Sequence, residues 1–295
     1  MPRVVGSRAA WILVPVAAVL GLHIACRCHA PETPGAAVGA SDRYVIPSKN
    51  VYAITEKGEF IYFATSDRGI FRFRRTSPQT VETVAATKAP IRGLLFHQEK
   101  LLALSYTRGL LEVVDKRLRP AKPATPPGWS LVHDESRKAI GVAGDLGVVI
   151  IEGERIKRVK RRGAHDIVFH GSTFAVAHRA GISVHHRQSG AVVRERFPGI
   201  NFWSARRHGD LIVYGGKGRV VLQRRGRWQT IALPDAKNVP WSSALVKRKL
   251  YIGTQRGLFV YDLTTEKLSA AGFPGQCIKA LFSDSRGTLW IGRFG

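Results

Sequence analysis

CIKALFSDSRGTLWIGRFG, residues 277–295, is the stretch that decides the fold. Residues 278–282 are mostly apolar, and residues 283–287, SDSRG, have the composition of a tight turn. Residues 288–292, TLWIG, are rich in residues that favour strands. The stretch therefore predicts a strand, a turn and a second strand.

The same unit recurs along the chain, and a closing glycine marks its period. The gaps between successive closing glycines are 40, 38, 34, 37, 39 and 38 residues. A period near 40 residues with short apolar strands is typical of a β-propeller blade. The sequence predicts an all-β fold, a β-propeller of about seven blades of four antiparallel strands. The closing glycines are Gly69, Gly109, Gly147, Gly181, Gly218, Gly257 and Gly295.

The seventh unit stops at its second strand, so the chain after it supplies no outer strands. Residues 43–46, RYVI, precede the first unit and could supply an outer strand. Pairing of the two ends of the chain would close the ring and remove an exposed sheet edge. We therefore expect the last blade to be either incomplete or closed by an N-terminal strand.

Two segments give the repeat a family resemblance: residues 284–292, DSRGTLWIG, and residues 250–261, LYIGTQRGLFVY. They resemble the D-x-x-G-x-L-W-I-G-T-x-x-G-L-x-x-Y repeat of two-component-regulator propellers. Such repeats are found in the periplasmic sensor regions of bacterial hybrid histidine kinases, which bind glycans, and in stand-alone secreted propellers. The resemblance implies the propeller fold and a ligand-binding role.

Residues 1–30 have the pattern of an export signal, with a basic start, an apolar run over residues 9–25 and a small-residue cleavage site ending at Ala30. The alternative is a lipoprotein signal that ends at residue 25, with a lipid attached to Cys26. Residues 31–41, PETPGAAVGAS, are expected to form a flexible linker before a propeller domain over residues 42–295. Both readings predict an exported protein, periplasmic or extracellular, with membrane contact only through a lipid anchor.

Cysteine usage is sparse. The chain has three cysteines, and cleavage after Ala30 would leave Cys277 alone. No disulfide framework is therefore expected to hold the domain together. We expect a monomer.

Charge is the unusual feature of the composition. Lysine and arginine number 46 against 21 aspartate and glutamate, a formal net charge of +25. An excess of this size predicts attraction to polyanions such as nucleic acid, anionic lipid or acidic polysaccharide. The alternative is that an arginine-rich composition reflects the base composition of the genome. Nothing matches a nucleic-acid-binding module, and export argues against that partner.

In propellers, the turn between the second and third strands lies on the same face as the start of each first strand, and this face usually bears the ligand funnel. Six of the seven units place a cation beside their closing glycine, so they would form a cationic rim on that face. Such a rim concentrates positive electrostatic potential at the central opening, and an arginine side chain binds carboxylate or sulfate through two hydrogen bonds. The alternative is a set of solvated turn residues without a ligand. The predicted rim residues are Arg68, Arg108, Arg179, Lys217, Arg256 and Arg293.

Three tryptophans, Trp129, Trp203 and Trp241, are expected at the start of first strands, on the same face as the rim. Sugars stack on indole rings, so the three are candidate ligand-binding residues. Packing between blades is the favoured alternative for each of them.

Histidines form two groups. His165 and His178 are expected on the funnel face, where a general base could act, but no carboxylate stands at a defined spacing from either. A second group is expected on turns of the opposite face, and because turns on separate blades diverge, no metal site is predicted there. This group comprises His97, His133, His170 and His208.

The basic run RIKRVKRR, residues 155–162, is expected on an outer strand of the third unit. Lysine and arginine protect an exposed sheet edge, and we favour this role over polyanion docking. Motifs of nucleophilic, zinc-dependent and phosphate-binding enzymes are absent from the sequence. Acidic residues are sparse on the predicted funnel face, which disfavours glycoside hydrolysis by paired carboxylates. The sequence therefore favours a non-catalytic protein without a cofactor.

The prediction from sequence is an exported, non-catalytic β-propeller that binds an anionic ligand, an acidic glycan or envelope polymer, through its cationic rim. The alternative is a protein–protein interaction scaffold of the cell envelope, in which the funnel is inert. A third reading is a polysaccharide lyase or hydrolase. The fold by itself does not choose among the three.

Overall fold

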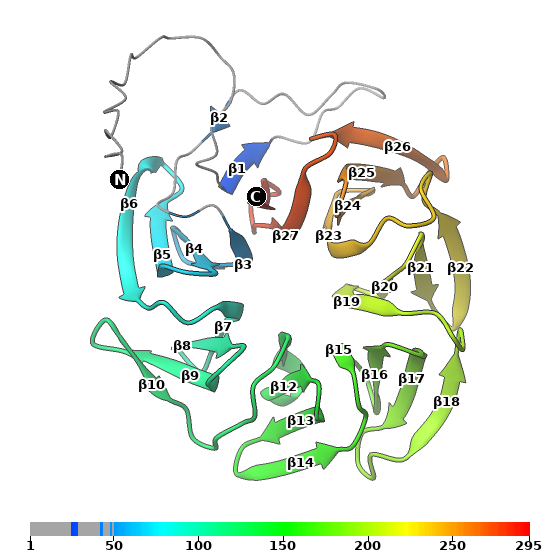
Figure 1. Ribbon diagram of the computed structural model, residues 1–295, viewed down its shortest axis with the longest axis horizontal. Coiled ribbons are helices and arrows are strands. Elements are labelled where there is room, and N and C mark those ends of the chain that lie inside the picture. Colours follow the sequence, from blue (N-terminus) through cyan, green and yellow to red (C-terminus); the bar gives the residue numbers. More distant parts are fainter. Residues whose placement is uncertain (1–24, 29–41, 44–47, 49) are drawn as a thin grey trace, which may run out of the picture.

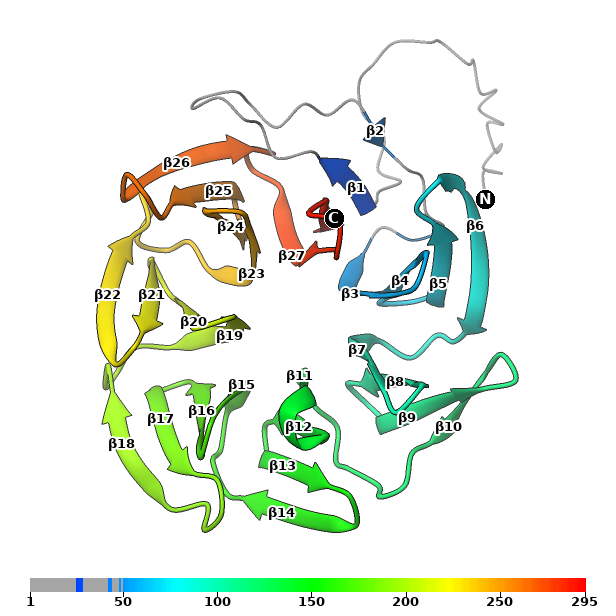
Figure 2. The same ribbon diagram turned by 180° about the vertical axis from the view of Figure 1, so that it is seen from behind.

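Seven antiparallel sheets surround a central axis in the computed structural model, which describes residues 25–28, 42–43, 48 and 50–295 (Figure 1; Figure 2 shows the ring from behind). Six sheets consist of four consecutive strands each, and the seventh takes strands from both ends of the chain. Within the six, the chain runs from the axis outward, so the first strand of each sheet is innermost (Figure 1). The predicted β-propeller architecture is confirmed.

The first three sheets contain twelve strands in sequence order. The first comprises β3 (Val51–Lys57), β4 (Phe60–Thr65), β5 (Gly69–Arg74) and β6 (Ser77–Ala86). The second comprises β7 (Ile91–His97), β8 (Lys100–Ser105), β9 (Gly109–Val114) and β10 (Arg117–Pro120). The third comprises β11 (Ser130–Asp134), β12 (Ala139–Gly144), β13 (Gly147–Glu152) and β14 (Arg155–Val159), with the short 3-10 helix η1 (Glu135–Arg137) between its first two strands.

The next three sheets repeat this order (Figure 1). The fourth comprises β15 (Ala164–His170), β16 (Thr173–His178), β17 (Gly181–His186) and β18 (Val192–Arg196). The fifth comprises β19 (Phe202–His208), β20 (Leu211–Gly216), β21 (Arg219–Arg224) and β22 (Arg227–Ala232). The sixth comprises β23 (Pro240–Val246), β24 (Lys249–Thr254), β25 (Gly257–Asp262) and β26 (Lys267–Gly272).

The seventh sheet closes the ring with strands from the N-terminal segment. Its order is β2-β1-β28-β27, where β27 (Cys277–Ser283) and β28 (Leu289–Phe294) are inner strands. β1 (Ala25–Cys28) pairs with β28, and β2 (Asp42–Arg43) pairs with β1. Closure by the N-terminal segment was predicted, but the strand beside β28 is β1, which lies upstream of the predicted residues 43–46. Of these, residues 44–46 lie outside the described residues.

The position of β1 bears on the export signal. Cys26, the predicted lipidation site, lies within β1, whereas residues 1–24 and 29–30 of the predicted signal, including Ala30, lie outside the described residues. Cleavage after Ala30 would remove β1 and leave β28 as an edge strand, whereas cleavage before Cys26 would keep most of β1. Among the described residues, no helix is long and apolar enough to cross a membrane.

In the first six blades the closing glycine of the repeat begins the third strand or directly precedes it, as the period predicted. Gly69, the first residue of β5, shows why glycine is needed there. Its φ of +111° is disfavoured for other residues, and a Cβ atom on it would lie 2.1 Å from the Ala85 carbonyl oxygen. The turn before β5 therefore excludes any side chain at this position.

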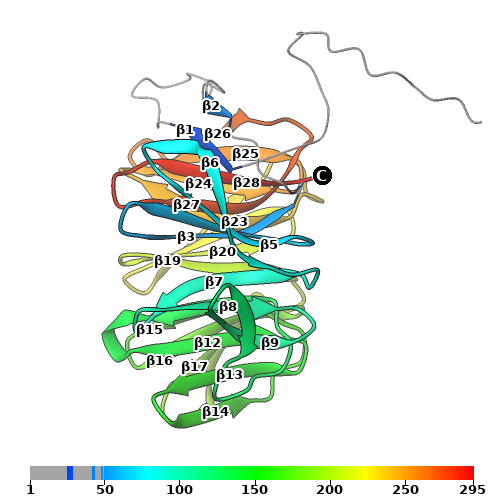
Figure 3. The same cartoon turned by 90° about the vertical axis from the view of Figure 1, so that its left-hand side faces the viewer.

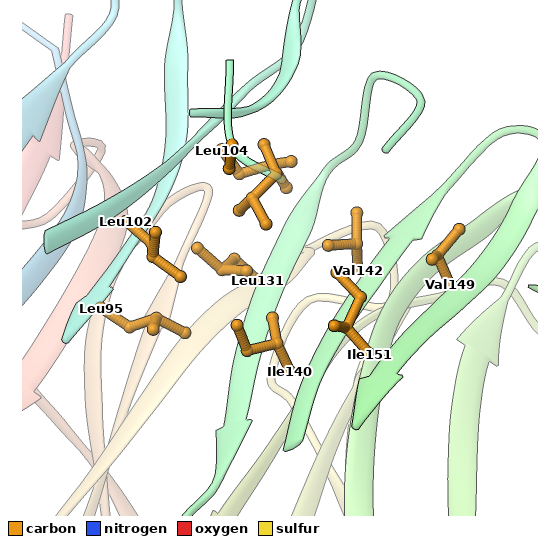
Figure 4. Close-up of a cluster of buried hydrophobic side chains, with 10 residues drawn as sticks. Leu95, Leu102, Leu104, Leu131, Ile140, Val142, Val149 and Ile151 are labelled. Carbon is orange, nitrogen blue, oxygen red and sulfur yellow. The ribbon is translucent and has the colours of Figure 1, made fainter. Parts of the chain in front are cut away.

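The hydrophobic core consists of layers between neighbouring blades. Figure 4 shows one layer, between the second and third sheets, where leucines of β7 and β8 face Leu131, Ile140 and Val142. Similar clusters fill the other junctions. Because the inner strands contribute to layers on both of their faces, they are apolar throughout and not alternating. In the edge-on view of Figure 3, the sheets of successive blades lie next to one another along the ring.

A buried polar clamp joins the seventh blade to the first. Asp284, in the β27–β28 turn, accepts hydrogen bonds from the Thr288 backbone N–H at 2.8 Å and from the Trp290 indole N–H at 2.9 Å. Arg75, directly after β5, lies 3.5 Å from the Asp284 carboxylate and also pairs with Glu56. Trp290 is fully buried against Phe73, with ring centroids 5.1 Å apart. The Asp and Trp of the repeat thus hold the ring closed.

The third and fourth blades are joined by the same type of clamp. Arg187, which follows β17 as Arg75 follows β5, pairs with Asp134 at the end of β11 and with Glu152 at 2.6 Å. Asp134 also caps η1 by accepting a hydrogen bond from the Ser136 backbone N–H. Hydrogen bonds from Arg187 and Ser136 hold the pKa of Asp134 below its usual value even though burial opposes this.

We expect Arg75→Met to destabilise the protein by about 3–5 kcal/mol, because it leaves the buried Asp284 carboxylate without its cation. The neighbouring Arg74 side chain is exposed and only 3.7 Å from Glu59, so Arg74→Met should cost at most about 1 kcal/mol. Thermal unfolding followed by circular dichroism measures both variants. Equal melting temperatures for the two would show that the clamp does not stabilise the ring.

Candidate binding site on the propeller axis

The start of each inner strand places one residue on the axis. In six blades the register shifts there, so that one residue is left without a cross-strand partner, which is the geometry of a β-bulge. In the third blade Trp129 takes the corresponding place, and its backbone N–H donates to the Ala143 carbonyl. We call these seven residues the axial ring. They are Tyr52, Arg92, Trp129, His165, Trp203, Trp241 and Lys279.

Ring stacking connects one side of the axial ring. The His165 and Trp203 rings are parallel, 3° apart in orientation, with centroids 4.2 Å apart. Trp203 and Trp241 follow at 5.3 Å, and the Lys279 Nζ atom lies 2.9 Å from the Trp241 ring centroid. The aromatic faces therefore stabilise a cation at the end of the stack.

Arg92 occupies the other side of the axial ring. Its guanidinium lies 3.8 Å from the Tyr52 ring centroid and 5.5 Å from that of Trp129. Three buried N–H donors of the ring have no acceptor among the described residues: Arg92 Nε, Trp129 Nε1 and Trp241 Nε1. Buried donors normally have an acceptor. The axial ring thus has donors and positive charge in excess of acceptors.

Neither cation of the axial ring is neutralised. No carboxylate among the described residues forms an ion pair with Arg92 or Lys279, although both side chains are half-buried. Burial, with the nearby Arg92 charge, lowers the pKa of Lys279 to about 8. An anion bound beside the two side chains would neutralise their charges and raise the pKa of Lys279 again.

A cavity of about 800 Å³ follows the axis and reaches this pair of cations. Tyr52, Arg92 and Lys279 line one end of it. At the other end it reaches the turn residues Glu135 and Gly209, on the face where the inner strands end. The cavity therefore extends to the face opposite the predicted funnel, and its size suits a small ligand.

A carboxylate bonded to the cavity-lining residues Ala205 and Arg206 is fully paired. Asp166 is almost fully buried and accepts hydrogen bonds from the Ser130 hydroxyl, from the Ala205 backbone N–H at 2.8 Å and from Arg206 at 2.5 Å. It is therefore a structural carboxylate and not a free base. Burial, with the Arg206 charge, lowers the pKa of His208 to about 4.

The six predicted rim cations take two positions. Five are exposed on turns of the glycine-turn face, which bears the β4–β5 turn and its equivalents, as predicted. Arg68, Arg179 and Arg256 each lie within 4.0 Å of a nearby aspartate, for example Arg256 at 2.5 Å from Asp235. Arg293 differs, because it is buried within β28 and donates to Gln276. None of the six lines the axial cavity.

His165 and His178 lack the arrangement of a general base. His165 Nδ1 is 2.8 Å from the Phe202 carbonyl oxygen, and its ring is covered by Trp203. His178 Nε2 is 2.7 Å from an Arg161 nitrogen, and its Nδ1 accepts from the Ala180 backbone N–H. Burial, with the Arg161 charge, lowers the pKa of His178 to about 4. Both histidines therefore serve structural contacts.

The histidines of the opposite face correct one expectation. They lie at the ends of inner strands, but they do not all diverge: His97 Nδ1 and His133 Nε2 are 3.1 Å apart. His208 Nε2 lies 3.0 Å from the Ser243 hydroxyl, and His170 is exposed. The ends of inner strands approach the axis, which brings neighbouring blades together. Among the described residues, no group of three or more metal-ligating side chains converges.

Three residues of the axial ring were missed by the sequence reasoning. Tyr52, Arg92 and Lys279 occupy the same repeat position as Trp203 and Trp241, each directly after the first residue of an inner strand or one later. Aligning the units on this position, and not only on the closing glycine, would have found them.

The chain matches no family model and no curated protein. Among solved structures it is similar to the extracellular domain of the putative one-component system BT4673 from B. thetaiotaomicron, with a TM-score of 0.67 and 13% identity over 83% of this chain and 40% of that chain. The extracellular domain of the putative hybrid two-component system BT3049 from the same organism gives 0.67 and 14% over 85% and 39%. The computationally designed protein Ika8 gives 0.59 and 15% over 83% of both chains.

These likenesses, at such low identity, establish the propeller fold alone. They confirm, at the level of fold, the resemblance to propellers of two-component systems that the repeat implied. The chain spans about two fifths of the length of the two bacterial domains.

Acid should destabilise this fold through its buried histidines. The folded-state pKa values of His208 and His178 lie near 4, below the ordinary 6.5, so the unfolded chain binds protons more readily. The stability that these two neutral histidines contribute is fully present above pH 6.5 and is lost as the pH falls toward 4. We expect melting temperatures of the His208→Gln variant to fall less over this range than those of the wild type. The exposed His170→Gln variant is the control, and an unchanged slope in His208→Gln would contradict the assignment.

Proposed function

We propose that this protein is an exported, non-catalytic propeller that binds an anionic ligand, an acidic glycan or envelope polymer, at the axial ring. One observation carries the proposal: Arg92 and Lys279 lie half-buried on the axis among aromatic rings, without a carboxylate partner among the described residues. An unpaired, partly desolvated charge costs free energy unless a ligand neutralises it. A pair of such charges is therefore a preorganised anion site.

The chemistry around the two cations suits an acidic sugar. A guanidinium binds a carboxylate or sulfate through two hydrogen bonds, and the Lys279 ammonium adds a second charge. Trp129 lies beside Arg92, Trp241 lies beside Lys279, and Trp203 packs against Trp241. The cavity of about 800 Å³ falls within the usual range for small-ligand sites. The likeness to extracellular propeller domains supports export.

The exposed rim has a supporting role in this proposal. Arg108 and Lys217 are exposed on turns of the glycine-turn face and do not line the axial cavity. Exposed charges act mainly through long-range attraction, which raises association rates and responds to salt. We therefore place the rim as an electrostatic guide toward the axial ring, and not as the ligand contact itself.

The direct test uses a uronic-acid oligosaccharide and its carboxyl-reduced, neutral counterpart. We expect the acidic form alone to bind in isothermal calorimetry, with affinity that falls as salt rises. Arg92→Gln and Lys279→Gln should each weaken binding by about 30-fold or more, because each leaves a bound carboxylate partly unpaired. The matched control is Arg158→Gln, which removes one exposed charge from the outer strand β14.

Other outcomes would redirect the assignment. Loss of binding in an Arg108→Glu, Arg256→Glu variant with full binding in Arg92→Gln would move the site to the rim. Equal binding of the acidic and neutral oligosaccharides would overturn the anionic class. A stable protein partner that co-purifies equally with all variants, in the absence of glycan binding, would favour the scaffold alternative.

The depressed pKa of Lys279 makes binding dependent on pH. The groups that face this amine are Arg92, Cys277 and the rings of Trp241 and Phe294, and Tyr52 lies beside Arg92. Burial raises the pKa of both the Tyr52 hydroxyl and the Cys277 thiol. Neither becomes an anion near pH 8, so a change there belongs to Lys279.

With a sulfated oligosaccharide, whose own charge does not titrate, affinity should decline as the pH rises through about 8 and beyond, because Lys279 loses its proton. Lys279→Arg should retain binding and flatten the profile, since arginine stays charged. A wild-type profile that stays level from pH 7 to 10 would show that the amine does not contact the anion.

A further inference from the structure

Two histidines of neighbouring blades meet at the opposite face, away from the axial ring. His97 is the last residue of β7, and His133 lies near the end of β11. Their Nδ1 and Nε2 atoms are 3.1 Å apart, with the two rings at 89° to one another. His133 also lines the axial cavity where the cavity reaches this face. No other pair of histidines among the described residues has its ring nitrogens in contact in this way.

The spacing of the two nitrogens suits a shared metal ion. Imidazole nitrogens bind zinc at about 2.0–2.1 Å. An ion at about 2.05 Å from both nitrogens would have an N–metal–N angle of about 98° for the 3.1 Å spacing. This angle lies between the right angle of square-planar coordination and the larger angle of a tetrahedron, which late first-row ions adopt.

The surroundings leave room for further ligands. Both rings are only half-buried, so water reaches them. The neighbouring carboxylate of Asp134 is already bound by Arg187 and Ser136, so it does not form a hydrogen bond or ion pair with either histidine. Glu135, the next residue, is exposed at the cavity mouth together with His133. Coordination positions not taken by the two histidines would therefore face solvent or the cavity.

We propose that His97 and His133 form a two-histidine site for a divalent late first-row transition metal ion, with water completing the coordination. Imidazole is a preferred ligand of copper, zinc and nickel ions. Two ligands preplaced on a rigid pair of inner strands bind together, because the second nitrogen is held at a high effective concentration. The proposal is independent of the anion site, since it involves neither Arg92 nor Lys279.

Copper(II) alone is the suitable reagent, because it binds nitrogen sites most tightly among the divalent ions of this series and reports its ligands spectroscopically. The purified, tag-free protein is titrated with Cu²⁺ in the presence of glycine, which suppresses weak surface binding. We expect one tight equivalent, and an electron paramagnetic resonance spectrum with coupling to two imidazole nitrogens. Zn²⁺ should compete for the same equivalent.

Substitutions locate the ion. His97→Ala and His133→Ala should each weaken the first equivalent by about tenfold or more, because only one nitrogen remains. The matched controls are His170→Ala and His186→Ala, which remove exposed histidines at the ends of β15 and β17 and should bind copper as the wild type does.

Several results would overturn the proposal. A wild-type spectrum with a single coupled nitrogen would show that the two histidines form only a hydrogen bond and do not share the ion. This measurement does not depend on the folding of any variant. First-equivalent affinity that is unchanged in both His97→Ala and His133→Ala, with native circular dichroism, would do the same. Loss of the tight equivalent in a control variant would place the ion elsewhere.

Discussion

Closure of the ring is the constraint on which the rest of the structure depends. Each blade is a sheet with two apolar faces, and it is stable only when a neighbour covers both of them. The junction between the seventh and first blades joins the two ends of the chain, so it carries the entropy cost of closing the longest loop. Trp290, packed on Phe73, and Asp284, held by Arg75, are among the buried contacts at that junction. The aspartate and tryptophan of the repeat motif therefore lie where the ring must close.

The polar groups of the protein divide into two classes with different consequences. Asp284, Asp134 and Asp166 are buried with their hydrogen bonds satisfied, and they fix blade positions. Arg92 and Lys279 are half-buried without a counter-ion among the described residues, and the aromatic faces of Tyr52 and Trp241 offset only part of that cost. Unpaired buried donors also occur elsewhere in the described fold, but at the axial ring three of them gather beside two cations without a counter-ion, and this is where binding is expected.

Both candidate sites follow from one feature of inner strands. In six blades their starts carry bulges that turn a side chain toward the axis, and near their ends side chains of neighbouring blades meet, as His97 meets His133. Seven short strands thereby bring together residues that are more than 180 positions apart in sequence, such as Arg92 and Lys279. The exposed rim arginines, by contrast, lie on separate turns of one face and do not line the axial cavity, and three of them lie beside an aspartate.

The sequence by itself determined the propeller fold, the period of its blades and the positions of its turns, because the closing glycines and apolar strands are local signals that recur seven times. It also placed Trp203 and Trp241 at the starts of inner strands. Only the tertiary structure decided which residues meet. The pairing of β1 with β28, the axial ring with its unpaired cations, and the contact between His97 and His133 depend on how blades are arranged around the axis. Contacts between blades have no local sequence signature, since they are set by register, bulges and ring closure rather than by neighbouring residues.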